Sequence, residues 1–303
     1  TVAVSDGTMT IDGALTATSG FTVTATGTVE VSGTGSITGG LLGGGGTATN
    51  NGTIDAVTSN LGSFTNGATG VVTGAMQTNG GTVVLETGSS VGSLSNLSGT
   101  TDVRGDVLGT TAVSDGTVTL NAGADLSDAD QVTVEGSGTL TVDSADTVGS
   151  VVQTGGTIDG GAVLTVTGTY GQSGGDMAGT LNAGGAKTLD GGTISGTLGG
   201  AGAATVQTGT TTLTGTIDSD LTVTSTLDVD GGDVTGVTTL DGGTLAGLSD
   251  GTVSGDVGLS AAGGAITAAT GTTLTLSVLN PDSASELTIG AAGQTGTVVV
   301  NGT

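Results

Sequence analysis

Short runs of β-branched and apolar residues alternate with polar residues along the whole chain. Three clear runs are LTVT at 221–224, LTLSVL at 274–279 and TVVV at 297–300. Successive side chains of a strand point to opposite faces, so this period of two predicts half-buried strands. Asp-Gly, Asn-Gly and Gly-Gly pairs separate the runs and predict turns with a positive φ. Because no ten-residue segment has helical periodicity, the pattern predicts an all-β fold.

One triplet, Gly-Thr followed by Val, Ile or Leu, recurs throughout the sequence. Its copies begin at Gly27, Gly52, Gly81, Gly116, Gly138, Gly156, Gly179, Gly192, Gly196, Gly215, Gly243, Gly251 and Gly296. Each copy combines a turn residue, a β-branched residue and an apolar residue that can point inward. The triplet therefore predicts a short strand entered from a tight turn, and such repetition is typical of solenoids.

Longer segments also repeat, with drift. Ala3–Ile11 (AVSDGTMTI) returns as Ala112–Leu120 (AVSDGTVTL). A second family contains Gln153–Gly160, Leu189–Gly196 and Leu240–Gly247, with Val229–Gly236 as a variant. Irregular spacing indicates one topology with loops of varied length. We therefore expect a single continuous solenoid over residues 1–303, cut from or stacked into a longer array.

A parallel β-helix fits these strands better than antiparallel hairpins do. Asp-Gly turns suit hairpins as well, and an array of β-sandwiches is the alternative. Very short strands without helical crossovers favour the parallel coil, in which equivalent residues stack. Coils of roughly 20 residues would give about 15 turns, about 4.8 Å apart. The Gly-rich stretches 39–46 and 199–204 predict corners, and Asn280-Pro281-Asp282 predicts a turn or an inserted loop.

The composition narrows the possible functions. The three aromatic residues, Phe21, Phe64 and Tyr170, suit the narrow core of a solenoid better than a globular core. The net charge of −25, with Arg104 and Lys187 as the two basic residues, excludes nucleic acids and anionic membranes as partners. No apolar run reaches 18 residues, so we expect no membrane span. The sequence has no Cys and no His, which removes disulfides and thiol chemistry.

Several aspartates occur in pairs, and paired carboxylates are the groups that catalyse glycoside hydrolysis. Asp128/Asp130, Asp218/Asp220 and Asp228/Asp230 all have the i, i+2 spacing that places two side chains on one face of a strand. A sugar cleft also needs aromatic platforms and basic groups, which this chain has in very small number. We therefore interpret these pairs as solvated turn carboxylates and expect no catalytic residue and no enzyme activity.

Calcium is the metal that the sequence allows. Asp228, Asp230 and Asp233 surround two glycines in the segment DVDGGD, and hard oxygen ligands suit calcium. The segment matches neither an EF-hand loop nor the glycine-rich nonapeptide repeat. We expect no cofactor, with a calcium site at these three aspartates as the open alternative to ordinary Asp-Gly turns.

Threonine runs occur at Thr22–Thr26, Thr210–Thr216 and Thr222–Thr226. Rows of threonine on a flat solenoid face can order water, as in ice-binding β-helices, provided that the rows align over several consecutive coils. The runs are scattered in the sequence, so β-propensity and surface hydroxyl ladders are the preferred explanation.

The units SDGTVTL, LDGGTISG and NNGTIDA (Asn50–Ala56), with the acidic, Cys-free composition, resemble the repeat region of bacterial autotransporter adhesins and filamentous-haemagglutinin-type surface proteins. This resemblance implies an extracellular protein at the bacterial surface or in the biofilm matrix, acting as a fibre or stalk. An adhesin segment that mediates attachment is the alternative, and its receptor is unknown. Uncapped coils would also favour head-to-tail self-association.

Overall fold

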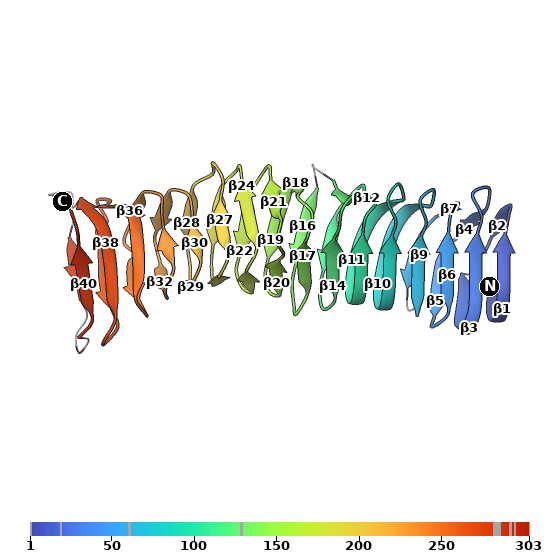
Figure 1. Ribbon diagram of the computed structural model, residues 1–303, viewed down its shortest axis with the longest axis horizontal. Coiled ribbons are helices and arrows are strands. Elements are labelled where there is room, and N and C mark those ends of the chain that lie inside the picture. Colours follow the sequence, from blue (N-terminus) through green and yellow to red (C-terminus); the bar gives the residue numbers. More distant parts are fainter. Residues whose placement is uncertain are drawn as a thin grey trace. The chain divides into compact units, whose positions relative to one another are not determined.

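The computed structural model describes residues 2–18, 20–59, 62–127, 130–280, 286–290, 293 and 295–302. These residues form stacked parallel coils, which confirms the predicted all-β solenoid of about 15 turns. They contain no helix. Contacts divide the chain into two compact units, one of Thr1–Ser150 with Gly160–Ala162 and one of Val151–Asp159 with Val163–Thr303. The single continuous solenoid over residues 1–303 stays a prediction. Figure 1 shows the coils of each unit following one another in chain order.

Each coil of the first unit has three sides, each formed by a short strand or part of a longer one. The first side contains the starts of β1 (Val2–Ile11) and β3 (Phe21–Val31), β5 (Leu41–Gly44), β8 (Val57–Ser59), the middles of β10 (Val71–Leu85) and β11 (Ser90–Val103), β13 (Thr111–Val113) and β16 (Gln131–Val134). The second contains the ends of β1, β3, β10 and β11, with β6 (Thr47–Asn50), β9 (Ser63–Asn66), β14 (Thr117–Leu120) and β17 (Thr139–Val142). The third contains β2 (Ala14–Thr16), β4 (Ser36–Thr38), β7 (Thr53–Ile54), the starts of β10 and β11, β12 (Asp106–Val107), β15 (Asp125–Leu126) and β18 (Asp146–Val148).

The second unit repeats this three-sided arrangement. One side contains β19 (Ser150–Gln153), β22 (Tyr170–Gln172), β25 (Lys187–Leu189), β28 (Ala204–Val206), β31 (Leu221–Val223), β34 (Thr238–Leu240) and the ends of β36 (Gly251–Leu259) and β38 (Thr273–Asn280). The next contains β20 (Thr157–Asp159), β23 (Asp176–Met177), β26 (Gly192–Ile194), β29 (Thr210–Leu213), β32 (Thr226–Val229), β35 (Thr244–Gly247), β37 (Gly264–Ala268) and β39 (Leu287–Ile289). The last contains β21 (Val163–Val166), β24 (Thr180–Ala183), β27 (Thr197–Gly199), β30 (Thr216–Ile217), β33 (Asp233–Val234), the starts of β36 and β38, and β40 (Thr297–Val300).

The core is a column of small apolar side chains inside these coils. The apolar residue of the triplet is buried in twelve of its thirteen copies, Val298 of the last copy being the exception. All three aromatic residues are fully buried. The inward apolar residue of the triplet is therefore confirmed, and it links the repeat in the sequence directly to the core.

The glycine of the triplet has a different role from the one predicted. Three of the thirteen, Gly81, Gly156 and Gly192, have a positive φ. At Gly215, which does not, a Cβ atom would lie 2.1 Å from the carbonyl oxygen of Gly196 on the neighbouring coil. In most copies glycine is thus explained by the close approach of successive coils rather than by a left-handed turn.

Two local predictions have mixed outcomes. Residues 199–204 include a corner between β27 and β28, as predicted. Residues 39–46 also contain a strand, β5. Its glycines can pair with β3 through the main chain alone, and the fully buried Leu41 packs into the core. The predicted turn at Asn280-Pro281-Asp282 falls mainly outside the described residues.

Candidate functional site

Aspartates at the corners bind the coils to one another. Asp115 accepts hydrogen bonds from the amide and hydroxyl of Ser137, at 3.0 Å each. Asp233 accepts hydrogen bonds from the amide of Ser254 at 3.0 Å and from its hydroxyl at 2.7 Å. Asp190 does the same with Thr208, at 3.1 and 3.0 Å. In each case the partner lies one coil further along the chain. We call these contacts the corner clips, and their chemistry is structural.

The three calcium candidates do not converge on one point. Asp228 lies on β32 between Thr212 and Ala246 of the adjacent coils, whereas Asp233 begins β33 and is engaged with Ser254. Burial raises the pKa of Asp228, and the nearby charge of Asp230 raises it further. Within the described ranges, no three His, Cys, Asp or Glu side chains are grouped so as to hold a metal ion.

We expect calcium to leave the thermal midpoint of the protein unchanged. A site that bound calcium in the folded state would raise stability with calcium concentration, but Asp233 is held by Ser254. Thermal unfolding with millimolar calcium, and with magnesium as the control ion, measures the effect. A calcium-specific rise that Asp228→Asn abolishes would support the calcium site that the sequence left open as an alternative.

Three of the aspartates considered for catalysis have separate structural partners. Asp218 accepts the hydroxyl of Thr235 at 2.6 Å, and Asp220 accepts the amide of Val237 at 3.1 Å. Asp130 accepts the hydroxyl of Ser127 at 2.8 Å. Asp128 lies outside the described residues. Asp218 and Asp220 thus join neighbouring coils, and Asp130 closes a local turn.

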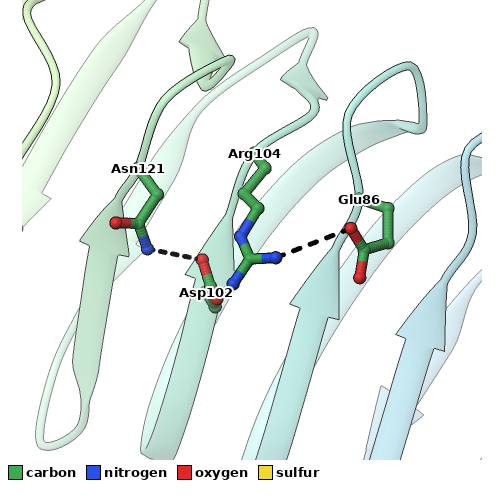
Figure 2. A network of polar contacts seen from close by, with 4 residues as sticks. All are labelled: Glu86, Asp102, Arg104 and Asn121. Atoms are coloured by element: carbon green, nitrogen blue, oxygen red, sulfur yellow. Dashed lines mark hydrogen bonds and ion pairs between the residues drawn. The ribbon is translucent and has the colours of Figure 1, made fainter.

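Arg104 joins polar side chains from three consecutive coils (Figure 2). Its guanidinium lies 2.6 Å from the carboxylate of Asp102 and 3.7 Å from that of Glu86. The amide of Asn121 donates to the other oxygen of Asp102 at 2.7 Å. Arg104 and Glu86 are about two-fifths exposed, 42% and 41%. Exposed ion pairs contribute about 0–1 kcal/mol each to stability, so this network stabilises the contact between neighbouring coils only modestly.

A short ladder of asparagines lies inside the first unit. Asn50 and Asn66 are fully buried and stack on adjacent coils. The Asn50 amide donates to the Asn66 oxygen at 2.8 Å, and the Asn66 amide donates to the carbonyls of Gly70 and Ser90 at 3.1 Å each. The ladder satisfies buried polar atoms at a corner, and the sequence pattern alone did not reveal it.

Lys187 lies in the core of the second unit. Its side chain is fully buried and stacks between Tyr170 and Ala204. Its ammonium donates to the carbonyls of Gly200 and Gly202, and Tyr170 donates to Gln153 at 2.7 Å. Burial lowers the pKa of Lys187. Burial raises the pKa of Tyr170, and the charge of Asp176 adds to that rise.

These two pKa shifts predict opposite pH dependences of stability. Below the ordinary Lys pKa of 10.5 the unfolded chain keeps a proton that folded Lys187 releases, so the free energy of unfolding rises with pH through this window. Above 10.0 the unfolded chain loses the Tyr proton that folded Tyr170 retains, so stability falls. We expect Lys187→Met to abolish the rise and to preserve the fall. Urea unfolding across alkaline pH measures both; an unchanged rise in the variant would contradict the assignment.

Threonines form a rank along the second side of the first unit. Each coil contributes one residue to this rank, and each residue pairs with the next in the order Thr8, Thr28, Thr47, Ser63, Thr82, Thr100, Thr117 and Thr139. Two residues further along the same strands lie Thr10, Glu30, Thr49, Thr65, Val84, Asp102, Thr119 and Thr141. We call these the first and second hydroxyl ranks. Their side chains alternate with buried residues and point outward.

The ranks are surface hydroxyl ladders of the kind expected from the sequence, and on this side they align over eight consecutive coils. Four members of the first rank, Thr28, Thr82, Thr117 and Thr139, are the middle residue of the triplet, so the repeat that fills the core also builds the rank. Of the runs singled out in the sequence, Thr222 belongs to another ladder, with Thr188, Thr205 and Thr239 in the second unit. Threonines separated by one coil in the sequence become neighbours in space. The fixed place of Thr in the triplet was the signal for this alignment.

No family model matches the chain, and neither a curated protein nor a solved structure is significantly similar to it. The fold is thus shown by the structure itself, whereas the resemblance to surface adhesins has no independent support. Among the residues described, no helix is long and apolar enough to cross a membrane.

Proposed function

We propose that this protein is a structural β-solenoid that forms a fibre or stalk outside the cell, at the bacterial surface or in the biofilm matrix, and that it is not an enzyme. The observation that carries the proposal is the set of corner clips. Asp115, Asp190 and Asp233 each use a carboxylate to hold the next coil. Side chains of the type that would perform chemistry thus serve stacking, which is what a mechanical element requires.

Head-to-tail association is part of this proposal. A parallel coil presents unpaired N–H and C=O groups along its outer edge, and another coil can pair with them. That coil can belong to the same polypeptide or to a second copy. The charge of −25 opposes contact between the sides of neighbouring columns, so end-to-end pairing is the favoured mode.

Electron microscopy of the purified chain, with and without millimolar calcium, tests the assembly. Uniform filaments with an axial repeat of one chain length are the expected result. Discrete short rods under both conditions would contradict head-to-tail assembly and would leave a stalk segment within a longer chain. Lateral bundles that appear with calcium alone would show that cations bridge the columns.

Adhesion is a second candidate function, favoured by the hydroxyl ranks. Eight consecutive coils present an aligned row of outward hydroxyl groups. The ranks therefore favour a surface that attaches to a partner, in addition to the mechanical role.

A further inference from the structure

We propose that the two hydroxyl ranks of the first unit form a face that binds the surface of ice. This inference goes beyond the structural function and stands independently of it. It begins with the spacing of the face. Neighbouring coils lie about 4.8 Å apart, and residues i and i+2 of a strand lie about 6.7 Å apart. Hydroxyl and methyl groups therefore repeat in two perpendicular directions. The two repeats are close to those of the oxygen atoms on a prism face of hexagonal ice.

The ranks are rigid and largely free of internal hydrogen bonds. Threonine is β-branched and therefore has a restricted χ1, and the ladder on either side fixes each backbone. In the described part of the chain, the side-chain hydrogen bond between members of the first rank joins Thr100 to Thr82 at 3.4 Å. Corner hydroxyls such as those of Ser137 and Ser254 are instead held by carboxylates. The rank hydroxyls are thus available to ordered water.

The charge distribution favours an uncharged partner. The chain carries 27 acidic residues, yet none lies in the first rank over eight coils. The second rank departs from threonine at Glu30, Val84 and Asp102, and Asp102 is bound by Arg104 and Asn121. Both ranks carry hydroxyl residues on five coils, at 8/10, 47/49, 63/65, 117/119 and 139/141.

The same surface is poorly suited to carbohydrate. Sugar rings are usually held against aromatic side chains, and Phe21, Phe64 and Tyr170 are all fully buried. Within the first unit, the described surface thus offers a lattice of hydroxyls and methyls without an aromatic platform. Ordered water is the partner that such a lattice fits, because water bridges can satisfy every hydroxyl at once.

The test is inhibition of ice recrystallisation by the full chain and by matched variants. Thr82→Tyr and Thr100→Tyr place a bulky side chain in the middle of the first rank, while tyrosine preserves strand propensity. Thr133→Tyr is the control, because Thr133 points outward from β16 on the first side of the same unit. Circular dichroism and urea unfolding confirm that each variant folds.

We expect the native chain and Thr133→Tyr to inhibit recrystallisation alike. Each rank variant should need about tenfold more protein, a loss of about 1.4 kcal/mol in binding. An inactive native chain would overturn the proposal, as would equal activity of all four proteins. Retention of the native chain on crystalline cellulose or chitin but not on ice, lost in the rank variants, would also overturn it and would assign the face to a polysaccharide. None of these outcomes changes the expected filament assembly, so the two proposals fail separately.

Discussion

Phe64→Ala should lower the free energy of unfolding of the first unit by about 3–5 kcal/mol. Phe64 is fully buried on β9 and stacks between Ala48 of β6 and Val83 of β10. Truncation removes the buried ring and leaves a cavity that small neighbours cannot fill. The repeat architecture limits the damage to adjacent coils, since each coil contacts its nearest neighbours.

Urea unfolding measures the total loss for Phe64→Ala, and hydrogen exchange of β6, β9 and β10 locates it. Thr65→Ala is the matched control, because Thr65 neighbours Phe64 on the same strand but points outward. Its effect should stay within about 0.5 kcal/mol. If Phe64→Ala cost less than about 1 kcal/mol, position 64 would not lie in a packed core.

Asn66→Ala should cost about 2–4 kcal/mol, although it removes fewer buried atoms than Phe64→Ala. The substitution deprives Asn50 of its 2.8 Å partner and leaves the carbonyls of Gly70 and Ser90 without the Asn66 amide. Each buried polar group without a partner costs about 1–3 kcal/mol. The loss of stability therefore comes from polar groups without hydrogen-bond partners, and its size depends on whether Asn50 is still present.

A double-mutant cycle in urea isolates this contribution. Leu85, Val103 and Leu120 occupy the same column one, two and three coils after Asn66, so leucine fits the position. We expect Asn66→Leu to cost more in the native chain than in an Asn50→Leu background, because the second variant has no stranded Asn50 amide. Additive effects within about 0.5 kcal/mol would show that the ladder is not coupled.

The sequence predicted the elements of this fold better than the contacts between them. Val29 and Leu140 are inward because the triplet has a fixed phase relative to the strand, and that phase is visible in the chain itself. The parallel coil also followed, because drifted repeats without helical crossovers stack most simply in that way. Local pattern and tertiary packing agree at these positions.

Residues whose role depends on the neighbouring coil were beyond such reasoning. Within the first rank the coil spacing varies, from 16 residues between Thr47 and Ser63 to 22 between Thr117 and Thr139. The residue that a given side chain contacts on the next coil therefore cannot be found by adding a fixed number to its sequence position. For that reason the sequence alone does not identify Asn66 and Lys187 as core residues, and it does not show which threonines align in the ranks. The aspartates were recognised as turn residues, but their bonds to the next coil required the register.

Two distances along the first rank test the stacking register of the coils most directly. The chain has no Cys, so spin labels can be attached at Thr8→Cys/Thr139→Cys and at Thr47→Cys/Thr117→Cys in an otherwise native protein. These pairs are seven and four coil steps apart in the first rank. Pulsed dipolar spectroscopy should give narrow distributions near about 34 and 19 Å. Distances that are broad, or that fail to grow with the number of coils, would contradict the parallel solenoid and with it the corner clips and the hydroxyl ranks.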